Sequence, residues 1–167
     1  DLVNEQNWQR FKAEAKTMAS LNHPSFVNVY DLGIHAGSTP FYSMDYLTGR
    51  SLEEILVDEG PLKLEAALNI FIEVLNGLAY AHRNGIIHRD IKPANIMICT
   101  TNGATQAKIL DFGISKLVSS DASKMQSMTM AGDVFGSPYY MSPEQCAGEP
   151  VDASSDIYSI GCTLFEV

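Results

Sequence analysis

The eight residues HRDIKPAN, at positions 88–95, constrain this chain more than any other stretch. They place a carboxylate, Asp90, five positions before an amide, Asn95, so that one short loop can present both groups. In the pattern H-R-D-x-x-x-x-N the Asp accepts a hydroxyl proton and the Asn binds a metal ion. Phosphoryl transfer needs this division of roles, because its catalysis is mostly positioning and neutralisation of developing charge. The complete octet therefore predicts a loop built for phosphoryl transfer.

Two further motifs follow: LDFG at positions 110–113, after a short apolar run, and GSPYYMSPE at positions 136–144. Together with the octet they give the chain a resemblance to protein kinases, closest to the eukaryotic-like Ser/Thr kinases of bacteria, from about Trp8 to Val167. The resemblance implies an α+β, protein-kinase-like fold. With 167 residues, we expect a partial fold comprising a fragment of the small lobe and the first half of the mainly helical large lobe.

The resemblance divides the chain into three parts. Residues 1–44 would form part of the small lobe, with one helix and two strands, residues 45–50 the hinge, and residues 51–167 part of the large lobe with the catalytic loop and activation segment. Helical periodicity of apolar residues, from about 4 to 21 and again from about 63 to 84, agrees with this division.

Local signals predict several boundaries. Ser51 with Glu54, and Ser142 with Gln145, have the spacing of a capping box at a helix start. The apolar runs 96–99 and 107–110 predict two strands around a turn at 102–103, with a looser loop than a two-residue hairpin. This hairpin would bring the residues after the second run to the same side as the catalytic loop. In the second long helix we expect an inward face of Leu64, Ala67, Leu68, Phe71, Leu75, Leu78 and Ala81.

The resemblance assigns the catalytic roles. Asp90 would be the catalytic base, and Lys92 would reach the transferring phosphate, a Lys at this position being typical of Ser/Thr-directed kinases. Asn95 and Asp111 would hold Mg²⁺, a hard cation that prefers oxygen ligands. Taken singly, Lys92 is a solvated surface lysine and Asp111 a turn residue; the four in order favour the catalytic interpretation.

The resemblance also implies a nucleotide site. Glu14 lies on the apolar stripe of the first helix, where a carboxylate requires a cationic partner; in the family this is a strand Lys that grips the phosphates. Neither that Lys nor a glycine-rich phosphate loop occurs in the sequence. The remaining implied positions are the gatekeeper Met44, the hinge residues Asp45, Tyr46 and Leu47, and Met97 beneath the adenine. Taken alone, Glu14 could be a partly exposed helix residue and Met44 a core residue.

Composition limits the partners. The net charge is −9, from 11 basic and 20 acidic residues, which argues against nucleic acid and against an anionic membrane surface. The three cysteines show no C-x-x-C spacing, so a disulfide framework or zinc site is not expected and a reducing cytoplasm is the default. We find no uninterrupted apolar segment long enough to span a bilayer, and membrane anchoring outside this stretch remains open.

Residues 114–136 have the character of an activation loop, being rich in Ser, Met, Ala and Thr. Arg89 precedes Asp90 directly and is expected to bind a phosphate on this loop, with Thr129 as the first candidate and Ser127 as the second. A merely polar, flexible loop is the alternative.

The sequence therefore predicts a Ser/Thr protein kinase catalytic domain, in fragment, that transfers the ATP γ-phosphate to protein Ser/Thr hydroxyls with Mg²⁺. These 167 residues by themselves are expected to be inactive. The alternative is a non-catalytic pseudokinase or regulatory binding module. The missing Lys and glycine-rich loop favour that alternative, whereas the intact HRDIKPAN and DFG motifs oppose it.

Overall fold

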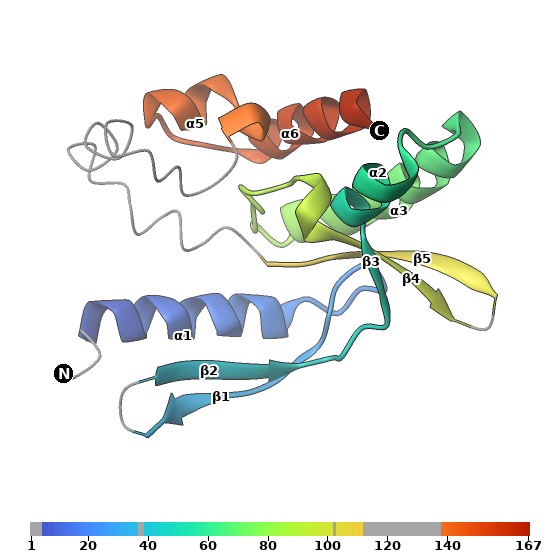
Figure 1. Ribbon diagram of the computed structural model, residues 1–167. Coiled ribbons are helices and arrows are strands. Elements are labelled where there is room, and N and C mark those ends of the chain that lie inside the picture. The colour runs from blue at the N-terminus through green and yellow to red at the C-terminus, as the bar shows by residue number, and fades with distance from the viewer. Residues whose placement is uncertain (1–4, 37–38, 102, 112–137) are drawn as a thin grey trace.

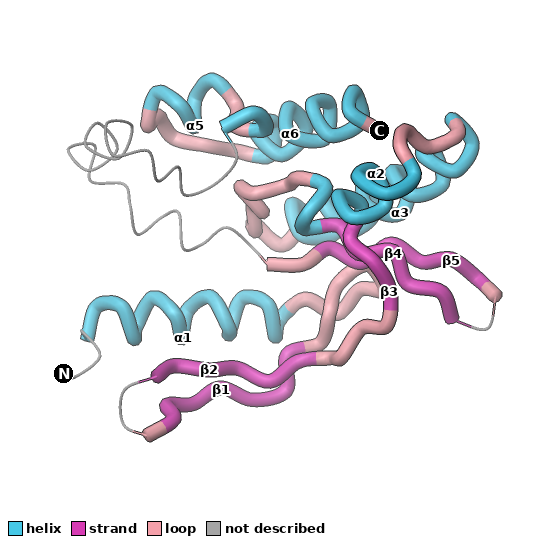
Figure 2. The backbone as a smooth tube through the Cα atoms, viewed as in Figure 1, coloured by secondary structure: helices cyan, strands magenta, loops and turns pink. Residues whose placement is uncertain are grey.

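The computed structural model describes residues 5–36, 39–101, 103–111 and 138–167. Figure 1 shows a small group of elements, α1, β1 and β2, below a larger group that carries most of the helices. Helices and strands are mixed along the chain, which confirms the predicted α+β class. Figure 2 shows a loop between the long helix of the larger group and one of its strands, and residues 88–92 lie in this loop.

The lower group consists of α1 (Glu5–Ser20) and an antiparallel pair, β1 (Val29–His35) with β2 (Thr39–Met44). The helix forms where the apolar stripe predicts it, and Ala15 and Met18 of that stripe are buried. α1 runs alongside the two strands (Figure 1). This packing partly covers one face of the sheet, where Leu32, Pro40 and Tyr42 are half-buried; in the described part of the chain the sheet has two strands.

A second, antiparallel sheet has the order β3 (Gly49–Ser51), β4 (Ile96–Thr101), β5 (Ala104–Ile109). Thr101 pairs with Ala104, so both strands run up to the 102–103 turn and the expectation of a looser loop is wrong. The reason is that the threonine pair Thr100 and Thr105 continues the ladder beyond the apolar runs.

Part of the expected hinge, 45–50, is strand. Gly49 and Arg50 belong to β3 and pair with Cys99 and Ile98 of β4. A Cβ at Gly49 would lie 2.3 Å from the carbonyl oxygen of Ile98, so a residue with a side chain could not approach β4 this closely. Residues 45–48, which have no regular secondary structure, connect β2 of the lower group to β3 of the upper group.

Capping explains where the helices of the upper group begin. Both predicted capping boxes are present: the Ser51 and Ser142 hydroxyls accept from the backbone N–H of Glu54 and Gln145, whose side chains accept in return. Asp152 caps the last helix, because its side chain accepts from the backbone N–H of Ser154. The helical elements are α2 (Leu52–Glu59), α3 (Leu64–Arg83), η1 (Pro93–Asn95), η3 (Pro138–Tyr140), α5 (Pro143–Ala147) and α6 (Ala153–Glu166).

α3 is the central helix, packed on β5 and α6, and four of the seven residues expected on its inward face are buried whereas three are not. Leu64 is 73% exposed, and Leu68 and Leu75 are also exposed. α3 is apolar on more than one side, so periodicity could not decide which side packs. By length and composition it is also the one helix in the described part that could cross a membrane, and here its buried face serves as a core face. The buried set is Ala67, Ile70, Phe71, Val74, Gly77, Leu78 and Ala81.

Candidate active site

The loop that carries Asp90 is held by a buried carboxylate on α6. Asp156 accepts hydrogen bonds from the backbone N–H of His88 at 2.9 Å and of Arg89 at 2.8 Å. His82, at the end of α3, completes the set with Nε2 at 2.7 Å from Asp156 Oδ2. Since Asp156 is fully buried, these donors are what satisfy its charge. The start of the catalytic loop is therefore fixed to α3 and α6 together.

Arg89 has a left-handed backbone, with φ 69°. A residue with a side chain adopts this conformation only where its surroundings impose it. Here both of its peptide groups are bound, because its N–H donates to Asp156 and its carbonyl accepts from Gln145 Nε2 at 2.8 Å. This turn of the backbone presents the next residue, Asp90, to the site.

His88 is fully buried and connects the loop to the end of β5. Its Nε2 lies 2.9 Å from the carbonyl of Leu110, and its Nδ1 accepts from the backbone N–H of Asp90 at 3.3 Å. Burial lowers the pKa of His88, although the charge of Asp156 opposes this. A neutral ring protonated on Nε2 satisfies both contacts. His88 therefore has a structural role, in which it joins the loop to the residue after β5.

Three of the predicted catalytic side chains meet. The Asp90 carboxylate Oδ2 lies 3.1 Å from Lys92 Nζ and 3.1 Å from Asn95 Nδ2. Asn95 Nδ2 also donates to the backbone carbonyl of Asp90 at 2.8 Å. The Asp90 side chain is only 17% exposed, so these neighbours hold it in place. Asn95 turns its amide nitrogen towards Asp90, so its Oδ1 takes no part in this contact.

Asp111 lies two residues after the end of β5, at the same end of the β4–β5 hairpin as Asn95. Ile96 pairs with Ile109, and the N–H of Leu110 donates to the carbonyl of Asn95 at 2.9 Å. The Asp111 backbone is left-handed, with φ 41°, and its side chain is exposed. Its Oδ1 accepts from the hydroxyl of Tyr42 at 3.3 Å.

The residues present fit a magnesium ion. Asn95 offers an amide oxygen and Asp111 a carboxylate, and both are the hard oxygen donors that Mg²⁺ takes with several waters. Within the described ranges, no three His, Cys, Asp or Glu side chains gather into a site suited to another metal. The donor set therefore matches the predicted use of these two residues.

The hinge residues expected at the nucleotide differ in how their side chains are bonded and exposed. The Asp45 carboxylate is occupied by the hydroxyl of Tyr30 and by the backbone and side-chain N–H groups of Asn28. The Tyr30 hydroxyl, and then the Asn28 backbone, lower the pKa of Asp45. Tyr46 is 94% exposed, and Met44 is exposed as well. Leu47 is half-buried.

Met97, expected beneath the adenine, is half-buried on β4 opposite Ser51. Glu14 lies in α1, but its side chain falls outside the described part of the chain, as do Phe112, Ser127 and Thr129 in full.

Sequence reasoning missed three contributors: His82, Gln145 and Tyr42. No motif points to His82, whereas the resemblance to protein kinases implies that Asp156 accepts hydrogen bonds from the backbone of the loop, as the structure shows. Glu144 of the GSPYYMSPE motif accepts from the hydroxyl of Ser155. All of these contacts join segments whose proximity is decided by the fold.

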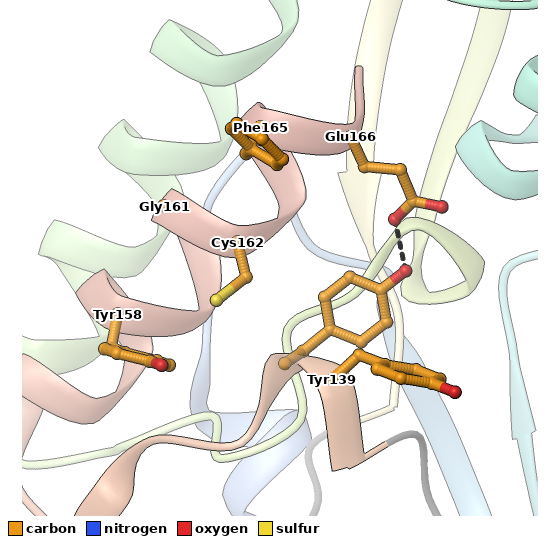
Figure 3. Close-up of a pocket in the computed structure, with 7 residues that line it drawn as sticks. Tyr139, Tyr158, Gly161, Cys162, Phe165 and Glu166 are labelled. Carbon is orange, nitrogen blue, oxygen red and sulfur yellow. Dashed lines mark hydrogen bonds between the residues drawn. The ribbon is translucent and has the colours of Figure 1, made fainter.

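A cavity of about 610 Å³ lies away from these residues, beside η3 and α6 (Figure 3). The Tyr140 hydroxyl donates to Glu166 at its edge, and burial, followed by this bond, raises the pKa of Tyr140. Neither Asp90 nor Asp111 lines the cavity, so we assign it no part in the chemistry. Its lining is mostly aromatic: Tyr139, Tyr140, Tyr158, Gly161, Cys162, Phe165 and Glu166.

Comparisons with known proteins agree with this geometry. The chain matches the protein kinase domain family over residues 2–167. It is 44% identical over 161 residues to the serine/threonine-protein kinase PknB of Mycobacterium leprae, covering 95% of this chain and 25% of that protein. It is 46% identical over 171 residues to a probable serine/threonine-protein kinase of Streptomyces coelicolor, covering 100% of this chain and 24% of that protein.

Among solved structures, the kinase domain of Mycobacterium tuberculosis PknI superposes with a TM-score of 0.72 at 29% identity, covering 96% of this chain and 56% of that chain. The chain thus spans about a quarter of the length of the curated relatives it matches. The family match over almost the whole sequence shows that this chain belongs to the protein kinase domain family.

Proposed function

We propose that this chain is part of the catalytic domain of a Ser/Thr protein kinase, which transfers the γ-phosphate of ATP to a Ser or Thr hydroxyl of a protein. The observation that carries the proposal is the convergence of Lys92 and Asn95 on Asp90, each at 3.1 Å. The relatives named as serine/threonine-protein kinases support the same activity.

Each of these residues has a role in the proposal. Asp90 orients the substrate hydroxyl and accepts its proton, and Lys92 offsets charge on the transferring phosphate. Asn95 and Asp111 hold Mg²⁺, which, when bound, neutralises charge on the phosphate oxygens. The backbone of residues 45–47 would meet the adenine edge, with Met44 and Met97 beside it and Glu14 paired to a phosphate-binding Lys.

The proposed setting is the cytoplasm, with protein substrates and without nucleic acid. The three cysteines, Cys99, Cys146 and Cys162, are free thiols in the structure, which suits a reducing compartment. The strongly acidic composition supports the absence of nucleic acid as a partner.

The test compares two substitutions in the full-length protein. Asp90→Asn should lower kcat by about 10²- to 10⁴-fold, the usual contribution of a catalytic base, with little change in stability. Asp111→Asn should weaken Mg²⁺-ATP binding more than Asp90→Asn does, as measured by calorimetry. Asp58→Asn, on an exposed surface of α2, is the matched control. Equal nucleotide affinity of the two site variants would contradict these roles.

A non-catalytic nucleotide-binding module is the second candidate, because the sequence contains no glycine-rich phosphate loop. The two are distinguished by the same experiment. A full-length protein that binds Mg²⁺-ATP but transfers no phosphate to any protein substrate would favour the module.

The proposed control of activity is a phosphate on the activation segment, bound by Arg89. Thr129 is the first candidate acceptor and Ser127 the second. In support, no residue in the described part of the chain forms an ion pair with the Arg89 guanidinium. Mass spectrometry of the active full-length protein should find phosphate there, and Arg89→Ala and Thr129→Ala should lose activation. Full activity in both, and in Ser127→Ala, would exclude the switch.

A further inference from the structure

The hydroxyl of Tyr42 donates to Asp111 Oδ1 at 3.3 Å, across a separation of 69 residues in sequence. Among the described residues, no other side chain forms a hydrogen bond or ion pair with this carboxylate. We propose that Tyr42 is a positioning residue, which orients the Asp111 carboxylate for the divalent cation. This inference rests on the proposed function, because it takes Asp111 as a metal ligand.

The Tyr42 ring is itself well held. Tyr42 lies on β2 opposite Leu32, and its side chain is half-buried. Its ring packs against Phe11 of α1, with centroids 5.7 Å apart and planes tilted by 36°. Phe11 in turn stacks on Trp8 at 5.9 Å. The hydroxyl is therefore presented from a ring that two elements, α1 and β2, keep in place.

Asp111 needs such a partner more than Asp90 does. Its side chain is exposed, at the end of a strand, and its backbone is left-handed, with φ 41°. An exposed carboxylate without a partner samples several rotamers, and that freedom is lost when it binds a cation. A hydrogen bond made before the cation arrives removes part of this cost.

The chemistry of a phenol suits this task. A neutral donor occupies one lone pair of Oδ1 and leaves Oδ2 open to a cation. A Lys or Arg in its place would neutralise the carboxylate and compete with the metal. Hydrogen-bonded partners of metal ligands typically contribute 10- to 100-fold to metal affinity. At 3.3 Å the bond is long, so we expect an effect near the lower limit, about 10-fold.

The test uses Tyr42→Phe in the full-length protein, which removes the hydroxyl and keeps the ring. Mn²⁺ replaces Mg²⁺ as a spectroscopic probe, and its binding is measured by electron paramagnetic resonance with a non-hydrolysable ATP analogue present. We expect about 10-fold weaker Mn²⁺ binding, the same shift in the Mg²⁺ dependence of transfer, and kcat close to wild type at saturating Mg²⁺. Binding of the analogue without metal should not change. A general structural defect would weaken that binding as well, so this measurement distinguishes the two.

Tyr80→Phe is the matched control. The Tyr80 ring also stacks on an aromatic neighbour, His23, at 5.2 Å, and among the described residues Tyr80 makes no hydrogen bond to Asp111. The Tyr80→Phe variant should bind Mn²⁺ with the same affinity as the wild type. In an Asp111→Asn background, Tyr42→Phe should have no further effect on Mn²⁺ affinity, because the partner of the hydroxyl has changed.

Unchanged Mn²⁺ affinity in Tyr42→Phe, with an active wild type, would overturn this inference and leave the proposed function standing. A wild type that binds Mn²⁺ but transfers no phosphate would overturn the proposed function instead. If Tyr42→Phe unfolds more readily than wild type, Phe11→Leu decides, because it keeps the hydroxyl and loosens the ring. A weaker Mn²⁺ affinity in that variant supports the role of Tyr42, and an unchanged one refutes it.

Discussion

The two aspartates of the site are supported in opposite ways. Asp90 lies in a loop whose backbone is bound by the buried Asp156 and the half-buried Gln145, and its own carboxylate is 17% exposed between Lys92 and Asn95. Asp111 is exposed, and in the described part of the chain its carboxylate has a single long hydrogen bond, from Tyr42.

This difference matches the proposed roles. A base must hold one geometry while a proton is transferred, so a rigid, over-determined support is useful. A metal ligand must exchange water for a cation, and an accessible carboxylate allows that exchange. The comparison predicts that damage to the support of Asp90 should reduce stability and kcat together, whereas damage near Asp111 should appear mainly in metal affinity.

The largest effect is expected from Asp156→Ala. It leaves the N–H groups of His88 and Arg89, and the ring of His82, without their acceptor in a buried place. Breaking such a set typically costs about 3–5 kcal/mol of unfolding free energy. Urea denaturation followed by circular dichroism measures the loss, and Asp156→Asn, which keeps the shape and one acceptor oxygen, should lose less. Equal stability of Asp156→Ala and wild type would contradict the account.

A smaller effect is expected from Glu73→Ala, which acts on the Asp111 side. Glu73 on α3 accepts from the N–H of Ala107 at 2.6 Å, on the edge of β5 that faces away from β4. Loss of the acceptor should cost about 1–3 kcal/mol, because a partly buried N–H is left unpaired. Glu73→Gln keeps an acceptor and should restore most of the stability. If Glu73→Ala lowered kcat as strongly as Asp156→Ala, the two supports would not be separate.

Lowering the pH should destabilise the loop through His88. Burial lowers the pKa of His88 in the folded state, so the unfolded chain binds the proton more tightly. The contribution of the neutral ring is complete above the pKa of about 6.5 of an unfolded histidine and is lost as the pH falls from there towards the folded pKa. Denaturation between pH 7 and 5 should show falling stability, with a shallower slope in His88→Gln. Equal slopes in the two proteins would refute this.

The smallest effect is expected from Arg50→Ala, remote from both aspartates. Arg50 bridges Asp58 and Glu59 at 2.6 Å each, but all three side chains are at least 40% exposed. Such pairs contribute about 0–1 kcal/mol and weaken with salt. Unfolding at low and high salt should show a small difference that salt removes. A loss as large as that of Asp156→Ala would mean that burial does not explain the ranking.

Much of this protein follows from local sequence. The octet HRDIKPAN names the groups that converge on Asp90, and capping boxes at Ser51 and Ser142 mark helix starts, because capping depends on residues three positions apart. The apolar runs before and after the 102–103 turn predict the hairpin that ends at Asp111. These signals are local, so no knowledge of the rest of the fold is required.

Only the tertiary structure decided the rest. The left-handed turn at Arg89 depends on Asp156, 67 positions away, and the partner of Asp111 is Tyr42, 69 positions away. Periodicity could not tell which side of α3 packs inward, since Leu64 and Leu68 are as apolar as the residues that are buried. Hydrogen bonds and burial between distant segments depend on how elements pack, and spacing along the chain contains no measure of that packing.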